Sequence, residues 1–141
     1  MPSTANPFPT VQVFSSSAYT DRTIEAASAK GTAFSVLPVT NDYCYIGSDT
    51  RFDMVIFDLN SAATVSDIVW EYNNGAAWTQ FAPMSGNMRY PDDGQDNELT
   101  DFNFGADGVE IFPANIMPFW STTAVNNITK YWIRVKGTVS S

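Results

Sequence analysis

The carboxylates are the side chains of this sequence whose type and spacing most readily suggest chemistry. Five of them stand close together, at Asp92, Asp93, Asp96, Glu98 and Asp101. Calcium binds through several oxygen ligands, which such a run would provide. The spacing differs from the EF-hand pattern, because Gly94 is not at the sixth position. A solvated acidic loop is therefore the favoured interpretation, the steering of a basic partner is the second, and no metal site is predicted.

Catalysis is limited by the residues that the chain lacks. Histidine is absent and cysteine occurs once, at Cys44. Ser-His-Asp sites, Cys-His sites, histidine-ligated zinc and four-thiolate zinc therefore cannot be built, and no glycine motif for nucleotide binding is present. A glycosidase-like carboxylate pair, such as Asp53 and Glu71, is the remaining alternative. Both are expected to be outward strand residues, so we predict a protein that is not an enzyme and binds no cofactor.

The net charge restricts the partners that the chain can bind. Fifteen acidic residues against seven basic ones give a net charge of −8. Nucleic acids and anionic lipids both require a basic binding surface, so neither is an expected partner. The sequence has no apolar run long enough to span a membrane and no signal peptide. We predict a protein that is made in a cytosol and stays soluble until it assembles.

The elements that would position these residues follow an apolar period of two, which is typical of β-strands. The alternation is clearest at residues 52–59, 68–72 and 131–136, and residues 73–75 form a hairpin turn signal. Residues 18–29 are predicted to be irregular or an edge strand. Short strands separated by frequent turns indicate an all-β fold, here a jelly-roll-like β-sandwich.

The alternation assigns each strand residue to a face. The residues expected to face the core are Val55, Phe57, Leu59, Ile68, Trp70, Tyr72, Tyr131, Ile133 and Val135. Those expected to face outward are Met54, Ile56, Asp58, Glu71, Trp132, Arg134 and Lys136. Most aromatic residues occupy inward positions, so core packing is favoured over the alternative of a sugar-binding platform.

A few large side chains are expected at the surface and are the candidates for a protein interface. Trp132 alternates onto the face that carries Arg134, and Trp120 follows Pro118 in a predicted loop. Tryptophan and arginine are enriched at the energetic centres of interfaces. Trp120, Trp132 and Arg134 are therefore interface candidates, together with Phe8.

The first eleven residues differ from the rest of the chain. Residues 1–11 hold three prolines and no periodic pattern, whereas residues 12–141 are predicted to form one β-sandwich domain. Proline fixes φ and removes a hydrogen-bond donor, so this stretch is predicted to be an extended N-terminal arm. A frayed terminus and an arm that crosses a neighbouring subunit, anchored by Phe8, are the two interpretations.

Three motifs in order carry a resemblance to a known class of proteins. They are YIGSDTRFD at 45–53, WEYNNGAAW at 70–78 and YWIRV at 131–135. Together they resemble a β-sandwich module of tailed-bacteriophage virion proteins, and above all small head decoration (cement) proteins. Similar motifs occur in phage tail proteins and in baseplates of contractile injection systems. The resemblance covers roughly residues 19–137, and the segment 82–108 departs from it.

The resemblance implies assembly onto a virion, without a cofactor and without catalysis. It implies the major capsid protein as partner, a homotrimer at local three-fold positions, and a place on the capsid surface after synthesis in the host cytoplasm. A single domain that starts at its own methionine and carries a proline-containing arm favours the head over the tail. The alternative is a tail, baseplate or host-recognition module that binds carbohydrate.

Overall fold

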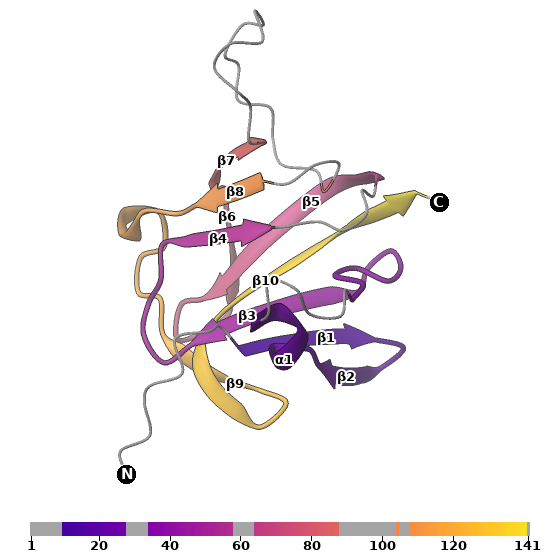
Figure 1. Ribbon diagram of the computed structural model, residues 1–141. Helices are drawn as coiled ribbons and strands as arrows, with labels where there is room; N and C mark the ends of the chain where they lie inside the picture. Colours follow the sequence, from indigo (N-terminus) through magenta and orange to yellow (C-terminus); the bar gives the residue numbers. More distant parts are fainter. Residues whose placement is uncertain (1–9, 28–33, 58–63, 88–103, 105–107, 141) are drawn as a thin grey trace, which may run out of the picture.

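The computed structural model describes residues 10–27, 34–57, 64–87, 104 and 108–140. These residues form two antiparallel sheets, one of seven strands and one of three (Figure 1). The larger sheet contains β1 (Thr10–Ser15), β2 (Ala18–Asp21), β3 (Tyr43–Ser48), β5 (Thr64–Asn73), β6 (Trp78–Phe81), β9 (Thr122–Val125) and β10 (Ile128–Ser140). The smaller sheet contains β4 (Met54–Phe57), β7 (Met84–Asn87) and β8 (Gly108–Ile111). The predicted all-β class is confirmed.

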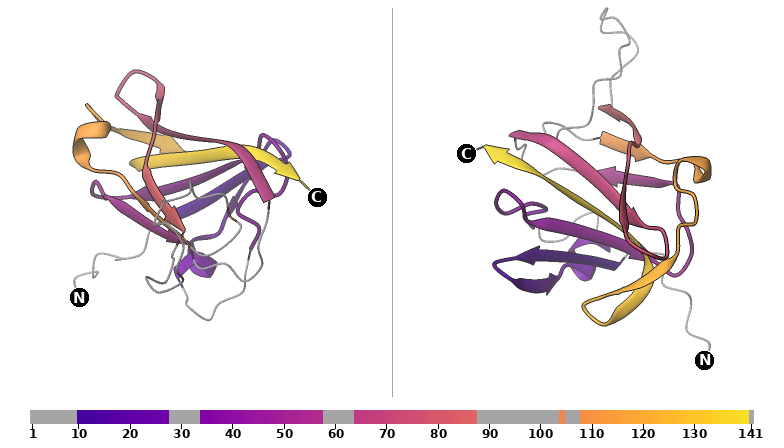
Figure 2. Two further views of the ribbon diagram at one scale, coloured as in Figure 1. Left: turned by 90° about the horizontal axis from the view of Figure 1, so that it is seen from above. Right: turned by 180° about the vertical axis from the view of Figure 1, so that it is seen from behind.

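The strand order of the larger sheet is β2-β1-β3-β10-β5-β6, and β9 pairs with β10. The long strands β5 and β10 lie side by side across the molecule (Figure 2). The smaller sheet has the order β4-β8-β7. The segment predicted as irregular or edge strand begins with β2, an edge strand, and continues into the short helix α1 (Thr23–Ala27). A 3-10 turn, η1 (Ala114–Ile116), follows β8.

Tight turns set the register of the hairpins. Ser16 and Ser17 join β1 to β2 with φ of 53° and 64°, and Asn126 and Asn127 join β9 to β10 with φ of 49° and 64°. Positive φ at both central residues matches the right-handed twist of the paired strands. Between β5 and β6, the Asn74 side chain accepts hydrogen bonds from two backbone amides of the turn, as the predicted hairpin requires.

The main core lies where the inner side chains of the two sheets meet. Phe57 of β4 and Trp70 of β5 have ring centroids 6.1 Å apart, and Phe81 of β6 packs against Phe112, which follows β8, at 5.7 Å. Trp70 and Tyr72 are 4% and 2% exposed. The inward assignment of the strand at 68–72 is therefore confirmed.

The outer face of the larger sheet carries a second apolar cluster. Its buried members are Trp132, Tyr45 and Val125, with Phe14, Tyr43, Trp78 and Ile128 packed partly buried against them. The strand alternation places Trp132 on this face, as predicted, but the side chain is 0% exposed. The β9–β10 hairpin and the neighbouring aromatic rings cover it, so its predicted place at the surface is wrong.

A glycine makes room for this tryptophan. Gly47 of β3 stands directly opposite Trp132 of β10, and a Cβ at position 47 would collide with the indole ring. Gly47 lies within the β3–β10 ladder, and the indole ring of Trp132 occupies the space that a side chain at position 47 would need.

Gly47→Ala is expected to lower the free energy of unfolding by roughly 1–3 kcal/mol, because extra volume in a packed site forces side chains or backbone to shift. Denaturant unfolding of the variant and the parent measures the loss. In the Trp132→Ala background the added methyl group meets no ring, so there the same substitution should have little effect. An equal loss in both backgrounds would contradict the steric explanation.

The start of the domain differs from the predicted boundary. The arm was predicted to span residues 1–11, but Thr10 and Val11 belong to β1, where they pair with Gly47 and Ile46 of β3. Val11 is 4% exposed and joins the main core. Residues 1–9, including Phe8, lie outside the described residues.

Candidate functional site

A cleft opens at one end of the larger sheet, beside the segment that connects β3 to β4. It has a volume of about 420 Å³. Its lining residues are Arg51, Phe52, Asp53, Phe112, Met117, Pro118, Phe119 and Trp120. They come from two segments, one between β3 and β4 and one between β8 and β9. Four of the eight lining residues are aromatic, one is cationic and one is anionic.

Hydrogen bonds fix the two walls of the cleft against each other. Arg51 donates from Nε and Nη2 to the backbone oxygen of Trp120, at 3.1 and 2.9 Å, and its guanidinium lies 5.3 Å from the Tyr131 ring centroid. Tyr72 donates its hydroxyl to the backbone oxygen of Pro118 at 2.9 Å. Phe52 packs edge-on against Trp120 with centroids 5.0 Å apart. The cleft is therefore built before any ligand arrives.

Phe119 stands out at the rim of this cleft. Its side chain is 83% exposed, and its backbone has φ of 61°, a left-handed conformation that is unusual for an aromatic residue. Its backbone oxygen accepts a hydrogen bond from the Ser121 hydroxyl at 2.7 Å. Strained backbone of this kind gathers at binding and catalytic sites. The fold thus holds a large aromatic side chain in solvent.

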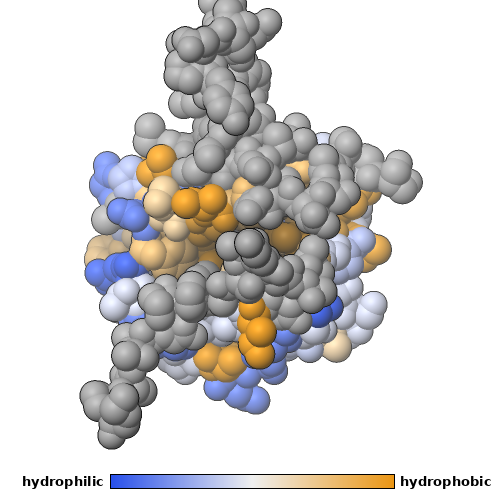
Figure 3. All heavy atoms as spheres, in the orientation of Figure 1, coloured by the Kyte–Doolittle hydropathy of each residue, from blue (hydrophilic) through white to orange (hydrophobic). Residues whose placement is uncertain are grey.

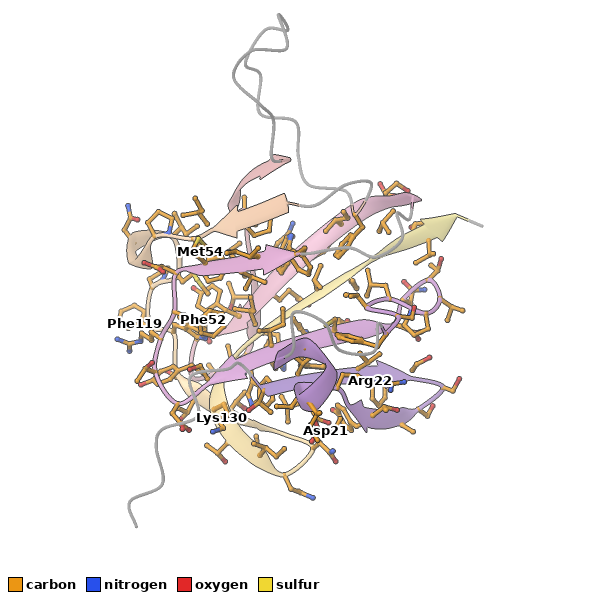
Figure 4. All side chains as sticks on the ribbon, in the orientation of Figure 1. Asp21, Arg22, Phe52, Met54, Phe119 and Lys130 are labelled. Atoms are coloured by element: carbon orange, nitrogen blue, oxygen red, sulfur yellow. The ribbon has the colours of Figure 1, made fainter. Side chains whose placement is uncertain are left out.

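Three further apolar side chains are exposed on the smaller sheet. Met54, Ile56 and Ile111 are 47%, 60% and 44% exposed. Met54 stands directly opposite Ile111 in the β4–β8 pair, and Ile56 is two residues further along the same face of β4. Met54 and Phe119 lie on the same flank of the molecule (Figure 4). We call Met54, Ile56, Ile111 and Phe119 the apolar patch.

The space-filling view shows where this patch lies. Hydrophobic surface is visible around the described part of the smaller sheet and is bordered by hydrophilic residues (Figure 3). An exposed apolar surface with a polar rim is typical of a site that binds another protein. Asp53 lines the cleft and precedes Met54, so the cleft and the patch adjoin each other.

Arg134 is the centre of a different cluster, on the outer face of the larger sheet. Its Nε donates to Glu71 Oε1 at 2.9 Å and its Nη1 to the Tyr45 hydroxyl at 3.2 Å. Its guanidinium lies 4.4 Å from the ring centroid of Tyr43 and 4.3 Å from that of Trp78. Burial lowers the pKa of Arg134, but its interactions with Tyr45 and Glu71 outweigh this and raise it. Arg134 is thus held by its own domain.

No protein-family model, curated protein or solved structure matches this chain. Within the described part of the chain, no helix has the length and apolar character needed to cross a membrane.

Two of the four predicted interface residues lie in the interior. Trp120 is 3% exposed and packs on Phe52 and Tyr131, while its indole N–H donates to the backbone oxygen of Trp132 at 3.1 Å. The prediction that Trp120 and Trp132 are surface residues is wrong. Arg134 is partly buried in its ion pair, with 16% of its side chain exposed.

The two carboxylates considered as a catalytic pair, Asp53 and Glu71, lie in different parts of the described structure. Glu71 pairs with Arg134 on the outer face of the larger sheet, whereas Asp53 lines the cleft, so the proposed catalytic pair is not brought together there. Among the described residues, no three histidine, cysteine or acidic side chains are placed to hold a metal ion. The acidic run at 92–101 lies outside the described residues.

The sequence interpretation missed the apolar patch as a surface. It placed Met54 and Ile56 on the outward face correctly, but outward apolar residues were not taken as a binding signal. Phe119 lies between Pro118 and Trp120, and nothing in that order shows which aromatic ring is buried. The signal that could have indicated this surface is the pair of outward apolar residues, Met54 and Ile56, on a strand without charged side chains.

Proposed function

We propose that this chain is a virion structural protein, a decoration protein that binds the outside of a phage head and stabilises it. The observation that carries the proposal is the apolar patch of Met54, Ile56, Ile111 and Phe119, exposed beside a preformed cleft. Burying such side chains against a partner is favourable by about 25 cal/mol per Å² of apolar surface. The major capsid protein is the proposed partner.

The sequence motifs and the composition support the same function. The order of YIGSDTRFD, WEYNNGAAW and YWIRV resembles cement proteins, and the net charge of −8 disfavours the packaged nucleic acid as the binding surface. We further propose that the two sheets form a jelly-roll-like β-sandwich and that the protein is a homotrimer on the capsid surface, made in the host cytoplasm.

The test is the occupancy of variants on heads that have been purified without this protein from the phage that encodes it. Ile56→Glu and Ile111→Glu place charges in the patch and should weaken attachment at least tenfold, because the charge would be desolvated without a partner. Ile24→Glu is the matched control, since Ile24 is 84% exposed on α1, outside the patch. Unchanged occupancy for both patch variants, with correct folding, would overturn the proposed docking surface.

A carbohydrate-binding module of a tail, baseplate or host-recognition protein is the alternative function. Five of the aromatic residues considered for a sugar platform are buried, namely Tyr45, Trp70, Tyr72, Trp120 and Trp132, whereas Phe119 is exposed. Tyr43 and Trp78 are partly exposed, but the Arg134 guanidinium packs against both rings. Only Phe119 of this set is freely exposed, and a single ring does not make a platform, so a glycan array should return no hits. Specific binding to one glycan would favour the alternative.

A further inference from the structure

Strand β4 has one edge without a neighbour among the described strands. The order of the smaller sheet is β4-β8-β7, so β8 is the only strand in the described part of the chain that pairs with β4. Natural proteins protect a sheet edge with charges, prolines or bulges, because an open edge can pair with another chain. β4 has no charged side chain and no proline, and its register with β8 is regular. Its open edge is therefore suited to receive a further strand.

The alternation of hydrogen bonds determines which backbone groups face this edge. The N–H of Phe112 donates to the backbone oxygen of Asp53 at 2.9 Å, so these two residues, which extend the β4–β8 register by one position, form a hydrogen-bonded pair. In an antiparallel ladder such pairs alternate with pairs whose N–H and C=O groups point away from each other. Val55 therefore bonds to β8, whereas Met54 and Ile56 direct their N–H and C=O groups to the open edge.

The same two residues also expose their side chains. Met54 and Ile56 are 47% and 60% exposed and belong to the apolar patch. An added strand would therefore find backbone partners at two positions about 7 Å apart, with an apolar side chain at each. In strand addition the backbone hydrogen bonds give affinity and the alternate side chains give specificity. Cross-strand neighbours on one face pack together, so the added strand should carry apolar residues at alternate positions.

The size of the edge favours an extended segment over a second copy of this domain. β4 has four residues, whereas a standard interface between two folded proteins uses about 20–30 residues per partner. An extended segment can continue beyond the strand. Asp53 precedes Met54 and lines the cleft, and Phe119 at the rim of the cleft is exposed. A segment that runs past the start of β4 therefore reaches the cleft and gains contacts there.

We propose that the open edge of β4 takes up an extended segment of the capsid protein as an additional strand. The segment hydrogen-bonds to the backbone of Met54 and Ile56 and packs its alternate apolar side chains on the apolar patch. The source of the segment rests on the proposed function, and the strand addition specifies how the partner is bound. Recognition through the side chains of the patch alone would not need the N–H of Ile56.

The first test compares two substitutions at one position on heads purified without this protein. Ile56→Pro and Ile56→Ala both remove the isoleucine side chain, but only proline removes the N–H that points to the open edge. Proline is tolerated at edge positions whose N–H faces solvent, so both variants should fold, which melting curves check. Ile56→Pro should bind heads at least tenfold more weakly than Ile56→Ala. Equal binding of the two folded variants would overturn the proposal.

The other open edge of the molecule supplies a matched control. In the β5–β6 hairpin the N–H of Asn74 donates to the backbone oxygen of Ala77 at 3.1 Å, so by the same alternation Gln80 directs its N–H away from β5. β6 ends the larger sheet, and Gln80 is exposed. Gln80→Pro should therefore bind heads as the parent does. An equal loss in Gln80→Pro would show that proline acts through the fold, which would overturn the proposed contact.

A strand supplied without a head separates this inference from the proposed function. The probe is an acetylated and amidated hexapeptide of alternating threonine and valine. In NMR titrations of the parent it should shift the amide signals of Met54 and Ile56 and slow their hydrogen exchange, and Ile56→Pro should bind it at least tenfold more weakly than Ile56→Ala. Peptide binding by a protein that does not attach to heads would reject the proposed function alone. Unchanged signals at both amides would overturn the open edge, whatever the heads show.

Discussion

Trp132→Ala is expected to lower the free energy of unfolding by roughly 3–5 kcal/mol, the range for truncation of a fully buried tryptophan. Trp132 is 0% exposed, packs edge-on against Tyr45 with centroids 6.4 Å apart, and donates its indole N–H to the backbone oxygen of Ile128 at 3.0 Å. Domains of this size are stable by only about 5–15 kcal/mol, so much of the total would be lost. Chemical denaturation followed by circular dichroism measures the change.

Two comparisons make this result specific. Trp70→Ala, in the main core on the opposite face of the sheet, should be destabilising to a similar degree, because Trp70 is 4% exposed. Thr122→Ala replaces an exposed side chain on β9 and should leave stability nearly unchanged. If Trp132→Ala instead unfolds at nearly the same denaturant concentration as the parent, the outer face is open and the predicted surface role of Trp132 regains support.

Alkaline pH is expected to destabilise the protein through its one thiol. Burial raises the pKa of Cys44 from 9.0 to about 12. The unfolded chain therefore loses this proton at a lower pH than the folded protein does, and the free energy of unfolding falls as pH rises above 9. The slope approaches 2.303RT per pH unit until pH nears the folded pKa, so the loss should be on the order of 3 kcal/mol by pH 11.

Denaturant unfolding of the parent and of Cys44→Ala between pH 8 and 11 separates this effect from other titrations. Burial also raises the pKa of Tyr45, so some alkaline loss of stability should remain in Cys44→Ala. Because only the parent carries the thiol, its free energy of unfolding should fall relative to that of Cys44→Ala as pH rises above 9. Below pH 9 the difference should stay constant, and a constant difference throughout the range would show that the thiol ionises in the folded protein as readily as in the unfolded one.

The strands could be predicted because alternation of side chains reports the two faces of a sheet. It placed Trp70 and Tyr72 in the core and Met54 and Ile56 on the outer face, as the structure shows. Alternation does not report what covers the second face. Trp132 is buried there because the β9–β10 hairpin folds over it, a tertiary contact that no local pattern contains.

The binding surface was harder to predict for a related reason. Trp120 and Phe119 are neighbours with opposite environments, because a positive φ at Phe119 turns its side chain into solvent while Trp120 packs on Phe52. The backbone conformation that separates them depends on contacts from Tyr72 and Arg51, which are distant in sequence. Residue type and position in a predicted loop therefore pointed to Trp120 as the surface residue, whereas the structure exposes Phe119.

The central position of β10 has a consequence for how the chain folds. Strands β1, β2 and β3 form one group and β5 and β6 another, and in the larger sheet both groups are joined through β10, the last strand in the described chain. During synthesis the facing edges of β3 and β5 therefore have no backbone partner until β10 emerges. Contacts of such large sequence separation form slowly, and unpaired strand edges favour aggregation. Nascent chains that stall before β10 should accordingly be prime substrates for chaperones.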